Sequence, residues 1–205
     1  MTRSKAPRAK RSSLLETSLF HMRKGDVFDT VRRLAHRLDE EGLDYVVVGG
    51  LAVGEHGYTR ATEDVDILMT RGGLEAFKER LLGRGYLPAF QGASKSFKDT
   101  ETGIRIEVLT TGEYPGDGKP KPVAFPDPSA VAVQGDDFRH INLEALLELK
   151  LASGLSAPHR LRDLADVVDL IAAAKLPQDL ADKLDPSVRA EYLRLWGLAQ
   201  DASAP

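Results

Sequence analysis

The stretch VVVGGLAVGEHGYTRATEDVDILM, which runs from Val46 to Met69, decides the fold and raises the first question about function. It begins as an apolar run typical of a buried strand, breaks at two glycines and ends on two aspartates separated by one valine. Alternate residues of a strand point to the same face, so Asp64 and Asp66 share a face and Val65 lies opposite. Because two like charges inside an apolar run are costly unless a positive charge lies nearby, the pair predicts a cation site.

A third carboxylate follows on a later predicted strand, GIRIEVLT. There Ile106 and Val108 share the apolar face, while Arg105 and Glu107 share the other. If this strand lies beside the one that carries the aspartates, Glu107 reaches the same site. Three carboxylates would suit one or two Mg²⁺ or Mn²⁺ ions, because magnesium binds through a few carboxylates together with substrate phosphates.

The glycine pair supplies a second element of the site. Gly49 and Gly50 close the first strand and precede a predicted short helix, so their backbone N–H groups could approach a phosphate. The sequence holds no G-x-x-x-x-G-K-[ST] phosphate loop, and no G-x-G-x-x-G follows the strand. The glycines therefore predict a phosphate contact that belongs to neither of these motifs.

Together these residues resemble the signature of the nucleotidyltransferase superfamily related to DNA polymerase β. The pair GG is followed after thirteen residues by DVD, and Glu107 stands where a third carboxylate comes from a later strand. The variant RATEDVDIL, with LKLASG and RLRDLADVVDL further on, resembles the AbiEii-type branch of bacterial toxin–antitoxin nucleotidyltransferases. The resemblance covers about residues 43–171. The sequence departs from the common pattern at Gly50, where serine is frequent, and at Glu107, where aspartate is common.

The resemblance implies a Mg²⁺-dependent enzyme that moves a nucleoside monophosphate from a nucleoside triphosphate to an acceptor hydroxyl. It implies that Asp64, Asp66 and Glu107 bind the metal ions and that Gly49 and Gly50 hold the phosphates. The acceptor could be a tRNA, a protein or a small molecule, and a cognate toxin or antitoxin partner is expected.

Two cations are candidates for the nucleotide site. Arg60 lies just ahead of the aspartates and could contact substrate phosphate or remain on the surface. Lys150 falls on the inward stripe of a predicted helix, where lysine is rarely buried without a partner. It could bind the triphosphate, or its aliphatic stem could extend past the edge of the core to solvent. In the second case Lys150→Met would leave stability and nucleotide transfer unchanged. Asp163 and Asp166 are expected on a solvated face, paired with Arg160 or Arg162.

Composition sets the broad class. The chain has 205 residues, 42% of them hydrophobic and 29% charged, a net charge of −3 and no cysteine. These values are typical of a soluble globular protein without disulfides or Cys-ligated zinc. Neither a membrane-spanning apolar run nor the apolar region of a signal peptide is present, so a cytoplasmic protein is expected.

The pattern along the chain predicts an α/β (α+β) fold, in which a small mixed sheet with helices on one face is followed by a helical region. Residues 1–12 are expected to form a disordered basic arm, residues 13–140 the nucleotidyltransferase-like core, and residues 141–205 the C-terminal helical region. Residues 112–140 are rich in proline and glycine and predict a long loop with one short strand at AVAV.

Two other functions fit parts of the sequence. One is a catalytically inactive binding protein or antitoxin that keeps the fold and acts through its helical tail. The other is nucleic-acid binding led by the basic arm, which would show a steep dependence on salt.

Overall fold

The computed structural model describes residues 23–201, so the predicted basic arm lies outside the described residues. The strands are β1 (Val46–Val47), β2 (Asp64–Met69), β3 (Tyr86–Pro88), β4 (Ser96–Asp99), β5 (Arg105–Thr110), β6 (Ala132–Gln134) and β7 (Arg139–Ile141). The helices are α2 (Asp26–Glu40), α3 (Gly49–Glu55), α4 (Arg71–Leu81), α5 (Pro128–Val131), α6 (Leu143–Ser156), α7 (Leu161–Ala174) and α8 (Pro186–Asp201), with 3₁₀ turns η1 (Pro158–Arg160) and η2 (Gln178–Lys183).

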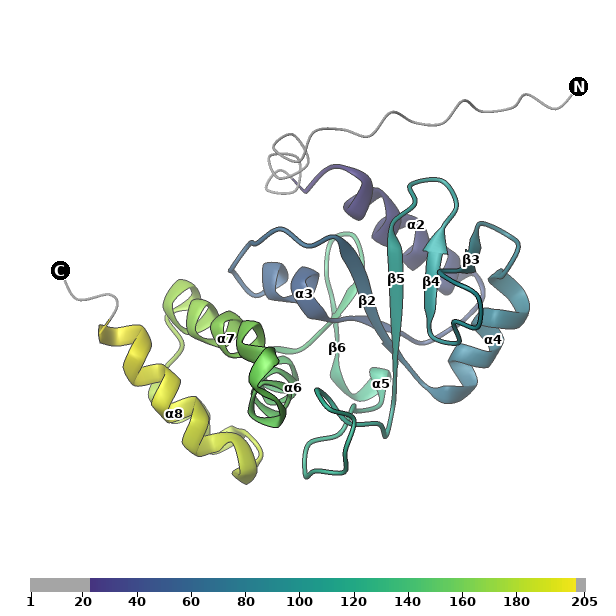
Figure 1. Cartoon of the computed structure of the whole chain (residues 1–205). Helices are drawn as coiled ribbons and strands as arrows, with labels where there is room; N and C mark the ends of the chain where they lie inside the picture. Colours follow the sequence, from purple (N-terminus) through teal and green to yellow (C-terminus); the bar gives the residue numbers. More distant parts are fainter. Residues whose placement is uncertain (1–22, 202–205) are drawn as a thin grey trace, which may run out of the picture.

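Within residues 23–201 the strands form one mixed seven-stranded sheet in the order β3-β4-β5-β2-β1-β7-β6. The central strand β2 runs parallel to β5 and antiparallel to β1. Figure 1 shows α6, α7 and α8 gathered at one end of the molecule and α4 at the opposite end. The predicted α/β fold with a mixed sheet and C-terminal helices is confirmed.

The alternation in β2 divides the molecule into two cores. Val65, Ile67 and Met69 are fully buried and pack with residues of α2 and α4. On the other face Leu68 belongs to a second core that includes residues of α3, α6, α7 and α8. The expectation that helices cover one face is therefore wrong, because the C-terminal helices pack over part of the face that carries the aspartates.

Local signals explain where most helices begin and end. The apolar stripe of α2 is buried along its whole length, and the helix ends before Gly42, whose φ is +65°. The side chain of Asn142 accepts a hydrogen bond from the backbone N–H of Ala145 and caps α6. Asp185 caps α8 by accepting from the N–H of Ser187. In α6 and α8 a side-chain oxygen thus satisfies an N–H that has no partner inside the helix.

The segment 112–140 differs from its prediction. The residues AVAV divide between the last turn of α5 and the start of β6, and β7 follows where a loop is expected. β7 pairs with β1 in parallel, through Val47 and His140. A strand of three residues is too short to show an alternating pattern, so its position depends on pairing with β1.

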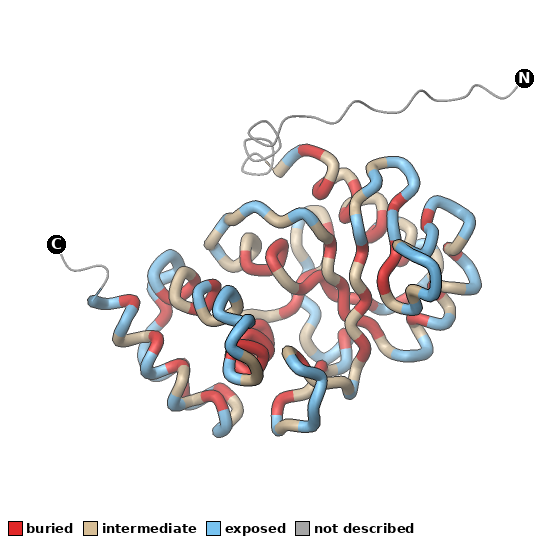
Figure 2. Tube along the Cα trace, viewed as in Figure 1, coloured by how far each residue is buried: buried red, intermediate tan, exposed pale blue. Residues whose placement is uncertain are grey.

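Burial is concentrated in the sheet and in α6, as Figure 2 shows. Most of α6 is buried, from Ala145 to Gly154, and Lys150 is among the buried residues. In the part of the chain that the structure describes, none of the helices combines the length and the apolar character needed to cross a bilayer.

Candidate functional site

The three predicted carboxylates lie together on one face of the sheet. β2 and β5 are in register, so that Asp66 is the partner of Glu107 and Asp64 the partner of Arg105. Partners on neighbouring strands point to the same face, which places all four side chains on one surface. Ser96 Oγ, on the next strand, donates a hydrogen bond of 2.9 Å to Glu107 Oε1. The expected proximity of the third carboxylate is therefore present in the fold.

Arg105 provides the positive charge beside these acids. Its Nη2 lies 2.5 Å from Oδ2 of Asp64, and its Nε lies 3.4 Å from Oε1 of Glu107. Among residues 23–201, no three acidic or histidine side chains are arranged as a ready-made metal cluster. The guanidinium thus links two of the three carboxylates.

The surroundings of Asp66 disfavour its negative charge. Burial raises its pKa to about 6, with the charges of Asp64 and Glu107 acting in the same direction and those of Lys150 and Arg105 against it. A further positive charge beside this group would therefore be favourable. The donor set consists of hard carboxylate oxygens, which is the chemistry that Mg²⁺ and Mn²⁺ prefer, so these residues fit the metal that the sequence resemblance implies.

Gly49 brings the backbone against Asp66. Its φ is +62°, and a Cβ at this position would lie 2.0 Å from Oδ2 of Asp66. Gly50 is covered by Thr62 and Arg60, whose nearest atoms would lie 3.0 Å and 3.2 Å from an added Cβ. Both glycines occupy the first turn of α3, where backbone N–H groups have no acceptor within the helix. The glycine pair is therefore needed for close approach as well as for the turn.

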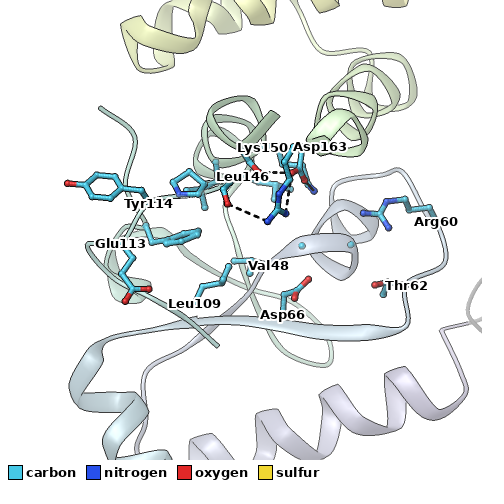
Figure 3. Close-up of a pocket in the computed structure, with 18 residues that line it drawn as sticks. Val48, Arg60, Thr62, Asp66, Leu109, Glu113, Tyr114, Leu146, Lys150 and Asp163 are labelled. Atoms are coloured by element: carbon cyan, nitrogen blue, oxygen red, sulfur yellow. Dashed lines mark hydrogen bonds and ion pairs between the residues drawn. The ribbon is translucent and has the colours of Figure 1, made fainter. Parts of the chain in front are cut away.

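A pocket of about 370 Å³ opens at this point (Figure 3). Its polar part is lined by Gly49, Gly50, Arg60, Asp66 and Lys150, so five of the predicted site residues meet there. Its apolar part is lined by Leu109, Phe125, Leu146 and Leu149. Asp64 and Glu107 are not among the lining residues. Asp64 lies two residues before Asp66 on β2, and Glu107 lies beside Asp66 on β5.

Lys150 is buried and paired with two carboxylates, so the simple snorkelling interpretation is wrong. Its Nζ lies 2.9 Å from Oδ1 of Asp163 and 2.6 Å from Oδ2 of Asp166. The expectation that these aspartates lie on a solvated face is also wrong for Asp166, which is 1% exposed. Asp163 lies 3.9 Å from Arg160, as expected for a partner, but its closer contacts are Lys150 and Ser153.

Arg60 joins the same network. Its Nε and Nη2 lie 2.5 Å and 2.8 Å from the two carboxylate oxygens of Asp166, in a bidentate pair. The pKa of Asp166 is lowered despite burial, which acts in the opposite direction, because Arg60 and Lys150 bind its charged form. Asp166 thus holds two cations that line the pocket.

The sequence interpretation did not identify Asp166 as part of this network. A usable signal was present, because a lysine on an inward helical stripe requires a partner and two aspartates three residues apart follow on the next helix. Arg105 was placed on the correct face, but its contact with Asp64 depends on the register between β2 and β5.

Comparison with solved structures supports the fold at low sequence identity. An antigenic nucleotidyltransferase-like protein from Paracoccidioides brasiliensis is similar with a TM-score of 0.52 and 16% identity, over 84% of this chain and 87% of that one. A proposed nucleotidyltransferase from Thermotoga maritima gives a TM-score of 0.46 and 21% identity, over 67% and 91% of the two chains. ANT(2″)-Ia, solved in complex with adenylyl-2″-tobramycin, gives 0.45 and 16%, over 85% and 99%. No curated protein matches the sequence significantly.

The profile of a family described as uncharacterised nucleotidyltransferases matches residues 5–198, which is nearly the whole chain. The description of this family gives the class of enzyme, a nucleotidyltransferase. The chain therefore belongs to this nucleotidyltransferase family.

Proposed function

We propose that this enzyme transfers a nucleoside monophosphate from a nucleoside triphosphate to an acceptor hydroxyl with the help of Mg²⁺ or Mn²⁺. The observation that carries the proposal is the pairing of Asp66 with Glu107, at the edge of a pocket lined by Gly49, Gly50 and Lys150. The site combines carboxylates for a metal with backbone and side-chain donors for phosphates.

Asp64, Asp66 and Glu107 would hold the divalent ion. When bound, such an ion would stabilise negative charge on the phosphate oxygens as pyrophosphate leaves. A cation beside Asp66 would be favoured, because burial and the neighbouring acids Asp64 and Glu107 raise the pKa of this carboxylate.

The pocket would bind the nucleotide through groups of this chain. The N–H groups of Gly49 and Gly50 would donate to phosphate oxygens, and Lys150 and Arg60 would attract the same charge. Asp166 holds both cations in ion pairs, so the two side chains would lose less conformational freedom when a nucleotide binds. The apolar part of the pocket suits the base.

Glu107 is suited to accept the proton of the acceptor hydroxyl. Its carboxylate is 32% exposed and is oriented by Ser96 Oγ. The sheet face beyond it is open, since Leu87 is 50% exposed and Lys98 is exposed as well. The acceptor would therefore approach over β5 and β4, on the side away from α6.

The test uses purified protein with each α-³²P-labelled nucleoside triphosphate, Mg²⁺ and a total cell extract. The wild-type protein should label one acceptor with one preferred nucleotide, and Asp66→Asn should abolish the labelling while keeping the melting curve cooperative. Equal labelling by both proteins would refute the assignment of Asp66. Equal nucleotide affinity with and without Mg²⁺ in calorimetry would refute the role of the metal.

Membership of the AbiEii-type branch, with a toxin or antitoxin partner, is part of this proposal and rests on the sequence resemblance alone. The extract assay addresses the acceptor that the proposal leaves open, because the labelled product can be digested with ribonuclease or protease. Loss of label on ribonuclease treatment would favour a tRNA acceptor, and loss on protease treatment a protein acceptor.

A further inference from the structure

Arg105 occupies a position for which the proposed function provides no role. It is the register partner of Asp64 on the strand that also carries Glu107. Its guanidinium contacts Oδ2 of Asp64 at 2.5 Å and Oε1 of Glu107 at 3.4 Å. These oxygens belong to two of the three carboxylates proposed to bind the divalent ion, so the two cations would compete for the same negative charges.

We propose that Arg105 is a displaceable counter-ion, which holds the carboxylates together in the free enzyme and leaves them when the divalent cation binds. This inference rests on the proposed metal site and adds a regulatory residue to it. Exchange is favoured because a guanidinium and a divalent ion beside the same two carboxylates repel each other, and the divalent ion carries the larger charge.

The exposure of the ion pair makes it suitable for exchange. The side chain of Arg105 is 51% exposed, and those of Asp64 and Glu107 are 31% and 32% exposed. Ion pairs with this access to solvent are weak and are screened by salt, so the guanidinium can leave without an uncompensated buried charge. Lys150 differs in this respect, because its side chain is 8% exposed and Asp166 is buried with it.

The exchange would also link the metal to the anionic substrate. A guanidinium released beside the site repels the arriving cation until an anion neutralises it, and a triphosphate brings that anion. Metal affinity should therefore be low without nucleotide. Removal of Arg105 should raise the affinity for metal alone, in the absence of any reaction.

Lys98 provides a matched control. It is the register partner of Arg105 on β4, lies on the same open face and is exposed, but no ion pair joins it to the three acids. Replacing it removes one nearby positive charge without freeing a carboxylate oxygen. The comparison separates direct competition from the general field of the surface.

The experiment is a titration of free Mn²⁺ followed by electron paramagnetic resonance, without nucleotide, on wild type, Arg105→Met and Lys98→Met. Arg105→Met should bind Mn²⁺ about tenfold more tightly, which corresponds to about 1.4 kcal/mol, and Lys98→Met should change the affinity by much less. Unchanged or weaker binding in Arg105→Met, or the same gain in both variants, would overturn the inference.

Thermal melting gives a second readout that does not depend on activity. Without metal, Arg105→Met should melt below wild type, because the three acids lose a counter-ion. Mn²⁺ should raise its melting temperature more than that of wild type, and equal shifts would overturn the inference.

If wild type transfers nucleotide but Arg105→Met gains no affinity, only this inference fails. If no protein binds Mn²⁺ and none transfers nucleotide, the proposed function fails as well.

Discussion

A Cβ on Gly49 would lie 2.0 Å from Oδ2 of Asp66, so the first turn of α3 and the second aspartate of β2 are in direct contact. This contact joins the glycine pair to the DVD segment of the same stretch, Val46 to Met69. The backbone at Gly49 also has a positive φ of +62°, a conformation that residues other than glycine rarely adopt.

Gly49→Ala should therefore damage the site more than the fold. The unfavourable backbone conformation costs about 1–3 kcal/mol, and the added methyl group must displace the Asp66 carboxylate. We expect nucleotide transfer to be lost while the protein still unfolds cooperatively in urea. Gly54→Ala in the same helix is the control, because nothing lies within 4 Å of its added Cβ and its φ is not positive. It should keep activity and gain up to about 1 kcal/mol. Full activity in Gly49→Ala would contradict the contact.

Asp66→Asn should raise stability in the absence of metal. The folded-state pKa of Asp66 is raised to about 6, so its ionised form is disfavoured in the fold at pH 7–8. A neutral amide removes that cost, and denaturant unfolding should show a gain on the order of 1–3 kcal/mol. Asp64→Asn should give no such gain, because Asp64 is paired with Arg105. A lower free energy of unfolding in Asp66→Asn would show that its charge is already compensated.

Lys150→Met should destabilise the protein, although the sequence alone favoured a neutral or favourable effect. Removal of the ammonium leaves Asp163 without its lysine partner and leaves Asp166 paired only with Arg60. Breaking a buried ion pair of this kind costs about 3–5 kcal/mol. Lys150→Met combined with Asp163→Asn should recover part of the loss in urea unfolding. A single variant as stable as wild type would indicate that the buried carboxylates do not need the lysine.

His140 should make the fold less stable in mild acid. Burial lowers its pKa, and the nearby charges of His56 and Arg23 lower it further. The unfolded chain therefore binds a proton more readily, so this contribution is complete above pH 6.5 and falls as the pH drops below that value. His140→Phe should reduce the loss of stability between pH 7 and pH 5, measured by urea unfolding at each pH. An unchanged slope in His140→Phe would exclude His140 as the cause of the loss.

The sequence by itself determined much of the local arrangement. The period of two in DVDILM put Asp64, Asp66 and Leu68 on one face and Val65, Ile67 and Met69 on the other, because side chains alternate along any strand. Helical periodicity indicated α2, and the capping residues Asn142 and Asp185 marked the starts of α6 and α8, since these signals act within a few residues.

Only the tertiary structure decided which groups meet. A shift of one residue in the register between β2 and β5 would place Glu107 on the face opposite to Asp66, and this register cannot be predicted from the sequence pattern. The pairing of Lys150 with Asp166 depends on how α6 packs against α7, and β7 exists because β1 offers it an edge. Periodicity specifies the face of an element, whereas register and helix packing depend on contacts between distant parts of the chain, and those contacts assemble the site.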